Sequence, residues 1–569
     1  MSTSEDTKRR AYIPGLWYRI LLILAAGLGG WLWIGDPTGD EGMRNVFTMM
    51  LTSLMLGIGF LWFLLRSAYR PRTRIITILL ITAAFWTFDQ CFELRGFSGA
   101  MIPDYVRRGD VTADAGPGAP TMAVEQPSED SLDLSVNSFI DWPGFMGPKR
   151  TGIVDHLQVT RDWSANPPKV LWKHSVGAGW GSFAVVAGTA LTCEELDVEA
   201  GVVQVVRAYD VNTGDLHWET SFTGDFDHPL GGRGPRSTPS VAAGKVVVLL
   251  PDGRLLCLRG ADGTIHWERD LIADFGITAD EEKAEMGYGR ANSPLIVEGG
   301  VIVPVGLNDE VKGAGLVCLD LNSGETLWKS PTRVPSFSSP MLARLNGRDQ
   351  ILILNEKTIT GHDPAGGEIL WEHPWPSKTE GDSNNSQPMV VGEDRVFVSR
   401  GYGAGCSVFV IEESDAVAEP DAGSDSAEAE GEADVTKHEY VTRLLWHSRR
   451  SLRTKMTSAV HREGHAYGLS DGMLECVDLE TGARIWKEGR YGHGQLLLID
   501  DLLLLISEEG ELKLIEATPE GEGELLASMP VLDGKTWNLL ALYGDRLLAR
   551  NGTEAACVRL PGELQASGE

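Results

Sequence analysis

Long apolar runs without charged residues occur only in the first hundred residues of the chain. Residues 46–65 form one run of 20 residues, which is the length that a helix needs to cross a membrane. Two shorter runs, 20–35 and 75–88, reach that length only with their flanking residues. We therefore predict membrane spans over 16–35, 46–65 and 75–94. A signal peptide is the alternative for the first run, and an interfacial helix is the alternative for the third.

Positive charges lie before the first run and between the second and third. They are Lys8, Arg9 and Arg10, followed by Arg66, Arg70, Arg72 and Arg74. The loop between the first and second runs is net acidic. Cytoplasmic loops are enriched in Lys and Arg. Three spans therefore place the N-terminus inside the cytoplasm and residues 96–569 outside it.

After residue 95 the apolar pattern changes. Residues 96–140 are rich in Pro, Gly, Ser and acidic residues, which predicts an extended tether. Short apolar strands then alternate with turns, and the spacing D-x-x-x-G-x-x-x-W recurs. The full copies end at Trp218, Trp328, Trp371 and Trp486, and a copy with Arg259 in place of Asp ends at Trp267. In this pattern Asp bonds the turn, Gly takes a positive φ, and Trp docks onto a neighbouring unit.

Two more tryptophans, Trp172 and Trp446, end similar strands. Successive Trp spacings are 46, 49, 61, 43, 75 and 40 residues, and Leu526 stands 40 residues after Trp486. Units of this length with about four strands are typical of β-propeller blades. The fold class is thus all-β, an eight-bladed β-propeller over 141–562 behind a membrane region, 1–95. The last unit lacks a fourth strand, which we expect residues 169–173 to supply.

Composition narrows the possible partners. The 569 residues include 50 Lys+Arg against 80 Asp+Glu, a formal net charge of −30, which argues against nucleic acid as a partner. The longest Trp spacing contains an insertion, 412–435. Ten acidic residues and no basic residue lie in 412–434, which predicts a disordered acidic loop. A functional version of this loop would bind a basic partner or Ca²⁺ weakly.

The repeats resemble the tryptophan-docking motif of quinoprotein alcohol dehydrogenases and of the wider pyrroloquinoline-quinone-like (PQQ-like) propeller repeat family. The resemblance covers roughly residues 140–560. The lead-in 141–152, DWPGFMGPKRTG, is similar to that of membrane-attached bacterial members without an assigned activity. The family also contains the propeller lipoprotein of the outer-membrane assembly machinery, which is a scaffold. The resemblance implies a protein of the bacterial cytoplasmic (inner) membrane with its propeller on the periplasmic side.

The first strand of each unit follows a polar turn, and in a propeller these turns converge on one mouth of the central channel. Converging cations on an acidic body would attract an anionic ligand. The more ordinary interpretation is that these residues cap strands and pair with acids on adjacent blades. The candidate ligand-binding residues are Trp180, Arg233, Arg236, Arg290, Asn292, Asn385, Gln387, Lys455, Gln495, Lys535 and Asn538.

Two functions remain open, together with a weaker third in which the protein is a sensor. The first is a binding or assembly scaffold for an unknown protein or anionic ligand. The alternative is a PQQ-dependent alcohol or sugar dehydrogenase, which alone would require PQQ and Ca²⁺. The dehydrogenases that the repeat resembles use a catalytic Asp, a Ca²⁺ held by Glu, Asn and Asp, and adjacent cysteines.

This sequence has no Cys-Cys pair and no acidic residue in the polar turns. No catalytic residue and no metal site is therefore predicted. Four cysteines occupy equivalent repeat positions and are expected to be small buried hydrophobes. They are Cys257, Cys318, Cys476 and Cys557.

Overall fold

The computed structural model describes residues 15–108, 132–135, 138–307, 313–375, 383–414 and 439–565. The chain divides into two compact units, Met1–Asp114 and Ala115–Glu569. From residue 415 to 435, the predicted acidic insertion lies outside the described residues.

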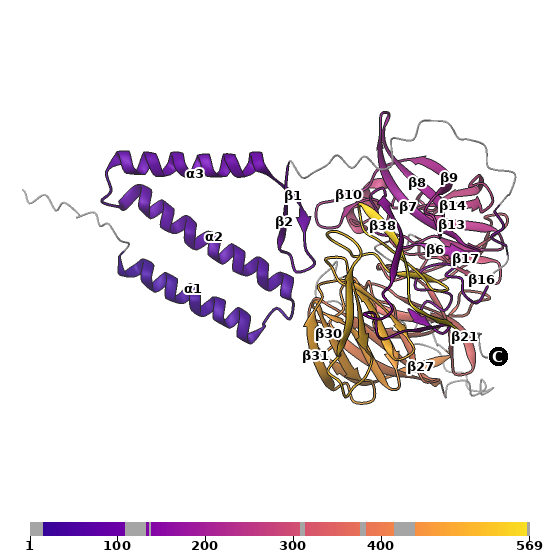
Figure 1. Ribbon diagram of the computed structural model, residues 1–569. Coiled ribbons are helices and arrows are strands. Elements are labelled where there is room, and N and C mark those ends of the chain that lie inside the picture. Colours follow the sequence, from indigo (N-terminus) through magenta and orange to yellow (C-terminus); the bar gives the residue numbers. More distant parts are fainter. Residues whose placement is uncertain are drawn as a thin grey trace, which may run out of the picture. The chain divides into compact units, whose positions relative to one another are not determined.

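Three helices make up most of the first unit (Figure 1). They are α1 (Leu16–Gly35), α2 (Glu41–Arg66) and α3 (Pro71–Cys91). All three are long enough and apolar enough to cross a membrane. Asp40 caps α2, because its Oδ1 accepts a hydrogen bond from the Met43 N–H at 2.8 Å. This cap starts α2 five residues before the predicted span.

The third helix differs from its prediction at both ends. It begins at Pro71, where a missing N–H is tolerated, and ends at Cys91 instead of residue 94. The next residues form β1 (Phe92–Phe97), which pairs antiparallel with β2 (Pro103–Arg107). Phe92 and Leu94 alternate with polar residues, and this is the period of a strand. The prediction of an extended tether from residue 96 was therefore wrong over this hairpin.

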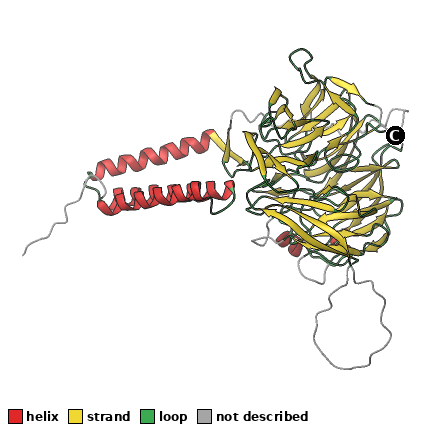
Figure 2. Ribbon diagram, turned by 90° about the horizontal axis from the view of Figure 1, so that it is seen from below, coloured by secondary structure: helices red, strands yellow, loops and turns green. Residues whose placement is uncertain are grey.

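The second unit is built from antiparallel sheets that follow one another along the chain (Figure 2). The first four sheets are β6–β9 (Ala184–Val186, Thr189–Val198, Gly201–Asp210, Leu216–Thr223), β12–β15 (Ser240–Ala242, Lys245–Leu249, Arg254–Arg259, Ile265–Asp270), β16–β19 (Leu295–Val297, Gly300–Val303, Val317–Asp320, Thr326–Lys329) and β20–β23 (Met341–Leu345, Arg348–Leu354, Thr358–His362, Ile369–Pro374).

The later sheets repeat this plan. They are β24–β27 (Met389–Val391, Arg395–Arg400, Gly405–Glu413, Tyr440–Ser448), β28–β31 (Val460–Arg462, His465–Ser470, Met473–Asp478, Arg484–Arg490), β32–β35 (Gln495–Ile499, Leu502–Ile506, Glu511–Glu516, Leu525–Pro530) and β36–β38 (Ala541–Tyr543, Arg546–Arg550, Glu554–Arg559) with β5 (Lys169–Ser175). The shorter elements are β3 (Ile153–Val154), β4 (Leu157–Val159), β10 (Asp227–His228), β11 (Gly232–Arg233), β39 (Gly562–Leu564), α4 (Leu271–Asp274) and α5 (Ala279–Glu285).

Buried apolar side chains join each sheet to the next. Phe222 of β9 packs in one cluster with Val246 of β13, and Leu354 of β21 packs with Phe409 of β26. The largest cluster joins the last two sheets to the first, and it contains both Leu548 and Val185. Every sheet therefore packs against two neighbours, and the last sheet packs against the first. This closed ring confirms the predicted β-propeller, and we call each sheet a blade.

The ring is closed by a strand from the beginning of the propeller sequence. β5 pairs antiparallel with β38, and Trp172 lies opposite Cys557. The prediction that residues 169–173 complete the last blade is confirmed. Nearby, β4 pairs with β39, and β3 adds a parallel fifth strand to β32. The two ends of the propeller sequence are thus bonded together, which protects a sheet edge that would otherwise be open.

The repeated tryptophans connect successive blades. The Trp218 indole N–H donates to the Gly260 carbonyl of the next blade at 3.0 Å, and its ring lies against Gly263. The same donation reaches the next blade from Trp172, Trp267, Trp328, Trp446 and Trp486, at 2.9–3.1 Å. Each ring covers a glycine with positive φ in the neighbouring turn, where a Cβ would collide with it.

Trp371 departs from the predicted docking. Its indole N–H donates at 2.6 Å to Oε1 of Gln350, which belongs to the same blade. In the next blade, the two strands that flank the corresponding turn end at Glu413 and begin at Tyr440, and most of the chain between them lies outside the described residues. Trp371 and Gln350 are both fully buried. This tryptophan therefore depends on a side chain instead of a backbone carbonyl.

The four cysteines of the repeat are buried as predicted. Burial raises the pKa of the Cys257, Cys476 and Cys557 thiols to about 12 and that of Cys318 to about 11. These side chains are therefore neutral thiols at physiological pH and act as small core residues.

The docking of Trp on Gly predicts different costs for two similar substitutions. Gly263 and Gly392 both have φ of +71°. Alanine should therefore cost either position about 1–2 kcal/mol of backbone energy. Only at Gly263 would the new Cβ collide with Trp218, because at Gly392 it meets nothing within 4 Å. Gly263→Ala should lose roughly a further 1–3 kcal/mol and melt at a lower temperature, as followed by tryptophan fluorescence of the detergent-solubilised chain. Equal melting of the two variants would contradict the docking.

A second prediction concerns Gln350. Gln350→Leu should leave the buried Trp371 N–H unpaired and destabilise the protein by about 1–3 kcal/mol. In a Trp371→Phe background the same change should cost much less, because the donor is already gone. Thermal melting of the two single variants and the double variant measures this coupling. Strictly additive losses would show that the hydrogen bond contributes nothing.

Candidate functional site

The polar turns that precede the first strands of the blades converge, as expected for a propeller. We call them the inner turns. Their backbone N–H groups bond to side chains of the next inner turn: Ser182 to Thr238, Thr238 to Ser293, Ser293 to Ser339, Ser339 to Gln387, and Gln387 to Ser458, all at 2.8–3.0 Å. Ser182 Oγ donates to the Leu539 carbonyl at 2.7 Å, which links the first blade to the last. The inner turns therefore form a bonded ring.

The predicted amide ligands belong to the same ring. Asn538 Nδ2 donates to the Gly179 and Gly181 carbonyls, and Asn292 Nδ2 donates to the Ser336 and Ser338 carbonyls. Gln495 Nε2 donates to carbonyls of both neighbouring blades, those of Met456 and Trp537. Gln387 bonds Ser339 in both directions, and Asn385 donates to the Lys455 carbonyl. These amides hold adjacent blades together.

Three of the cations predicted to bind a ligand pair with carboxylates instead. Arg290 is buried and makes a bidentate contact with Glu282 at 2.7 and 2.8 Å. Arg233 contacts Glu195 at 3.0 Å and Asp197 at 2.9 Å. Burial raises the pKa of Glu195, and the Arg233 guanidinium opposes this rise.

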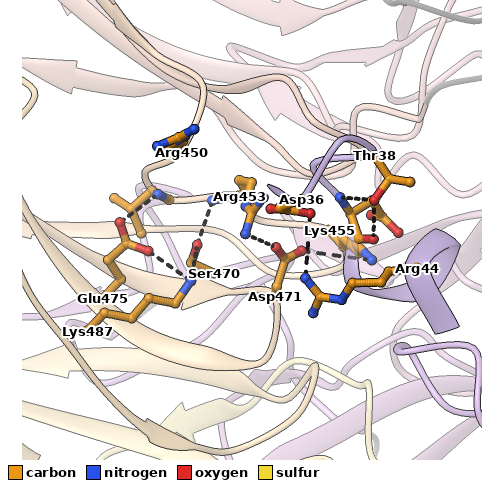
Figure 3. A network of polar contacts seen from close by, with 12 residues as sticks. Asp36, Thr38, Arg44, Arg450, Arg453, Lys455, Ser470, Asp471, Glu475 and Lys487 are labelled. Atoms are coloured by element: carbon orange, nitrogen blue, oxygen red, sulfur yellow. Dashed lines mark hydrogen bonds and ion pairs between the residues drawn. The ribbon is translucent and has the colours of Figure 1, made fainter. Parts of the chain in front are cut away.

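The third pairing cation, Lys455, lies 3.9 Å from Asp471, which also contacts Arg453 at 2.7 Å. Figure 3 shows Arg453 and Lys455 at Asp471, and it shows Lys487 at Glu475. Because these cations have carboxylate partners, little of their charge is left to attract an anion.

The inner turns themselves contain no acidic residue. However, Glu195 lies on β7, Asp471 lies between β29 and β30, and Glu282 lies on α5. Their positions in the repeat differ from blade to blade, so no recurring pattern in the sequence could have identified them. Among the residues that the structure describes, no three His, Cys, Asp or Glu side chains gather as a metal-binding group.

The two remaining cations lie on aromatic rings. The Arg236 guanidinium lies 4.8 Å from the Phe226 ring centre and donates to the Gly232 and Gly234 carbonyls. Burial lowers the pKa of Arg236 to about 10. Lys535 Nζ lies 4.2 Å from the Trp537 ring and 5.1 Å from the Trp180 ring. In such contacts the face of the aromatic ring attracts the cation electrostatically.

Half-buried aromatic side chains extend around the inner turns. Trp180 and Trp537 have ring centres 5.2 Å apart, and Tyr288 lies 5.7 Å from Phe337. Phe226 and Tyr402 each carry a cation from an inner turn. We call this set the aromatic rim; its members are Trp180, Phe226, Tyr288, Phe337, Tyr402 and Trp537, all partly exposed. Of these six residues only Trp180 was predicted from the sequence, although Phe337 and Trp537 also stand in inner turns.

Comparisons with known proteins agree with the resemblance to PQQ-like propeller repeats. The family described as outer membrane protein assembly factor BamB matches residues 202–488, half of the chain. A curated protein of that name from Burkholderia pseudomallei (strain K96243) is 26% identical over 259 residues, which cover 40% of this chain and 65% of that protein. The chain therefore spans slightly less than two thirds of the length of this relative.

Solved structures align at lower identity. BamB from Moraxella catarrhalis aligns with a TM-score of 0.45 and 17% identity, covering 68% of this chain and 99% of that chain. A europium-containing methanol dehydrogenase aligns with a TM-score of 0.45 and 11% identity, covering 74% and 98%. Because the family match extends over half of its length, the chain belongs to the family described as outer membrane protein assembly factor BamB.

Proposed function

We propose that this protein is a membrane-anchored scaffold whose propeller binds another protein at the aromatic rim. The relative from Burkholderia pseudomallei is named an outer membrane protein assembly factor, which supports a role in protein assembly. The observation that carries the proposal is the rim itself. It presents partly exposed Trp, Tyr and Phe rings around one mouth of the propeller, and such side chains dominate the binding energy of protein interfaces.

The chemistry of the rim favours a partner segment that carries apolar and acidic side chains. Arg236 lies on the Phe226 ring, and Lys535 lies on the Trp537 and Trp180 rings. An acidic side chain of the partner could approach these cations while its apolar neighbours cover the rings. Arg233, Arg290 and Lys455 already have carboxylate partners, so we assign them a structural role.

A PQQ-dependent dehydrogenase fits these residues less well. A hard divalent cation needs several free carboxylate or carbonyl oxygens. Glu195, Glu282 and Asp471 each pair with an arginine, and Glu508 accepts hydrogen bonds from the Trp537 indole N–H at 2.9 Å and the His493 backbone N–H at 3.0 Å. The Oδ1 atoms of Asn292 and Asn538 have no partner among the described residues, but amide oxygens carry no net charge to balance that of Ca²⁺. We therefore keep the scaffold as the function and derive no reaction step through a quinone.

The first unit supplies the anchor in this proposal. α1, α2 and α3 are each compatible with a membrane span. The arginines between α2 and α3 favour a cytoplasmic location for that loop. We infer that the protein lies in the bacterial inner membrane and that the propeller is periplasmic, where it could contact proteins in transit to the outer membrane.

Site-specific photocrosslinking tests the binding surface. A photoreactive phenylalanine analogue at Tyr288, on the rim, should form a discrete adduct with one envelope protein in living cells. The matched control is Tyr543, an equally half-buried tyrosine on β36 outside the rim, which should give no such adduct. Trp180→Ala together with Trp537→Ala should reduce the Tyr288 adduct at least fivefold.

Two outcomes would reject the scaffold proposal. One is equal crosslinking at Tyr288 and Tyr543, which would show that the rim is not a preferred surface. The other is saturable oxidation of alcohols or sugars by the purified full-length protein that depends on added PQQ and Ca²⁺. That result would establish the dehydrogenase alternative.

The topology of the first unit can be tested separately. At residue 130, an alkaline phosphatase fusion should be active and a green fluorescent protein fusion should not fluoresce, as expected for an extracytoplasmic position. Fusions at residue 70, between the second and third helices, should show the reverse pattern. Cytoplasmic reporter activity at residue 130 would overturn both the number of spans and their orientation.

A further inference from the structure

The lead-in segment, 141–152, places an arginine inside the propeller. Trp142 exchanges two backbone hydrogen bonds with Val185, at 2.7 and 2.8 Å, which holds the segment against β6 of the first blade. Arg150 then reaches three other blades. Its guanidinium donates to the carbonyls of Ser293 at 3.0 Å, Pro340 at 2.8 Å and Pro294, and to Ser240 Oγ at 3.3 Å.

This guanidinium is a buried charge without a counter-ion. The Arg150 side chain is only 5% exposed, and no carboxylate lies within salt-bridge distance among the residues that the structure describes. Burial lowers the pKa of Arg150 to about 9. Four of its five N–H donors are used by Nη1 and Nη2, whereas Nε–H has no partner in the described part of the chain. Buried charges in proteins are normally paired, because an isolated one is costly.

Arg150 also lines a cavity of about 390 Å³. Its apolar wall comes from Met146 of the lead-in and from Met341, Met389 and Ala459 at the first strands of three blades. A volume of this size lies within the range of small-molecule sites. His461 contributes a second polar group, because its Nδ1 is buried and has no partner.

The other cations of the cavity differ from Arg150. Lys149 and Arg344 line the same space but are 74% and 67% exposed. Each has its own carboxylate, Asp155 at 2.8 Å and Asp349 at 2.9 Å. Arg150 is therefore the only one of these three cations that is both buried and unpaired.

We propose that this cavity is a binding site for a small amphiphilic carboxylate, whose charged end accepts a hydrogen bond from Arg150 Nε–H while its apolar body packs on the methionines. The ligand neutralises the buried guanidinium, and His461 offers a second hydrogen bond near the cavity wall. The site is separate from the aromatic rim and does not depend on the scaffold function.

Matched ligands test the charge requirement in the unaltered protein. The full-length chain in zwitterionic nanodiscs is titrated with octanoate, octanamide and octylamine, and the heat from empty nanodiscs is subtracted. Octanoate should bind saturably, with a dissociation constant at least tenfold below that of octanamide, and octylamine should not bind. Equal affinities for octanoate and octanamide, or no saturable octanoate binding, would overturn the proposal.

Variants then locate the site. Arg150→Gln should weaken octanoate binding at least tenfold, whereas Lys149→Gln, the exposed neighbouring cation, should change it less than twofold. Thr151→Trp fills the cavity from the lead-in segment without altering the guanidinium, and it should abolish binding. This variant keeps the test valid if Arg150→Gln fails to fold. Unchanged binding by Thr151→Trp, or equal losses in Arg150→Gln and Lys149→Gln, would reject the cavity as the site.

Discussion

The contact on which the whole propeller depends is the docking of one tryptophan onto the turn of the next blade. The indole N–H of Trp218 bonds the Gly260 carbonyl, and its ring fills the space that Gly263 leaves open. Six tryptophans repeat this contact between successive blades. Each one fixes both the spacing and the rotation of a blade against its neighbour. Without that fixed rotation the inner turns would not meet at one mouth of the channel.

Convergence of the inner turns has a consequence for function. Polar groups that lie close together and away from water are usually hydrogen-bonded, and here most of the donor groups bond a neighbouring turn, although the side-chain oxygens of Asn292, Gln495 and Asn538 have no partner among the described residues. The amide N–H groups of Asn292, Gln495 and Asn538 donate to carbonyls of neighbouring blades. Arg290 forms an ion pair with Glu282. The side chains left to meet a partner are therefore the aromatic ones, whose faces need no hydrogen bond. Turns that are polar in sequence are therefore surrounded by the partly exposed rings of the aromatic rim.

The sequence could predict the structural features that recur from blade to blade, but it could not predict the contacts that occur in a single blade. The propeller, its closure by residues 169–173 and the buried cysteines follow from a period that appears again and again. Trp371 differs because an insertion in the sequence lengthens the turn that it should meet, and its indole N–H bonds Gln350 of its own blade instead. The carboxylates of Glu195 and Asp471 also come from unrelated positions. The end of α3 was misplaced because an apolar strand with aromatic residues resembles the last turn of a span.

The propeller contains cations in two different environments. At the inner turns, cations are paired with carboxylates or lie on aromatic rings that remain partly open. Inside, the lead-in segment inserts Arg150 among backbone carbonyls, which can accept its hydrogen bonds but cannot neutralise its charge. Partial charges on carbonyl oxygens stabilise a guanidinium less than a carboxylate does. The difference between the two environments is thus one of charge balance, because an anion that binds at Arg150 would supply the counter-charge that the carbonyls cannot.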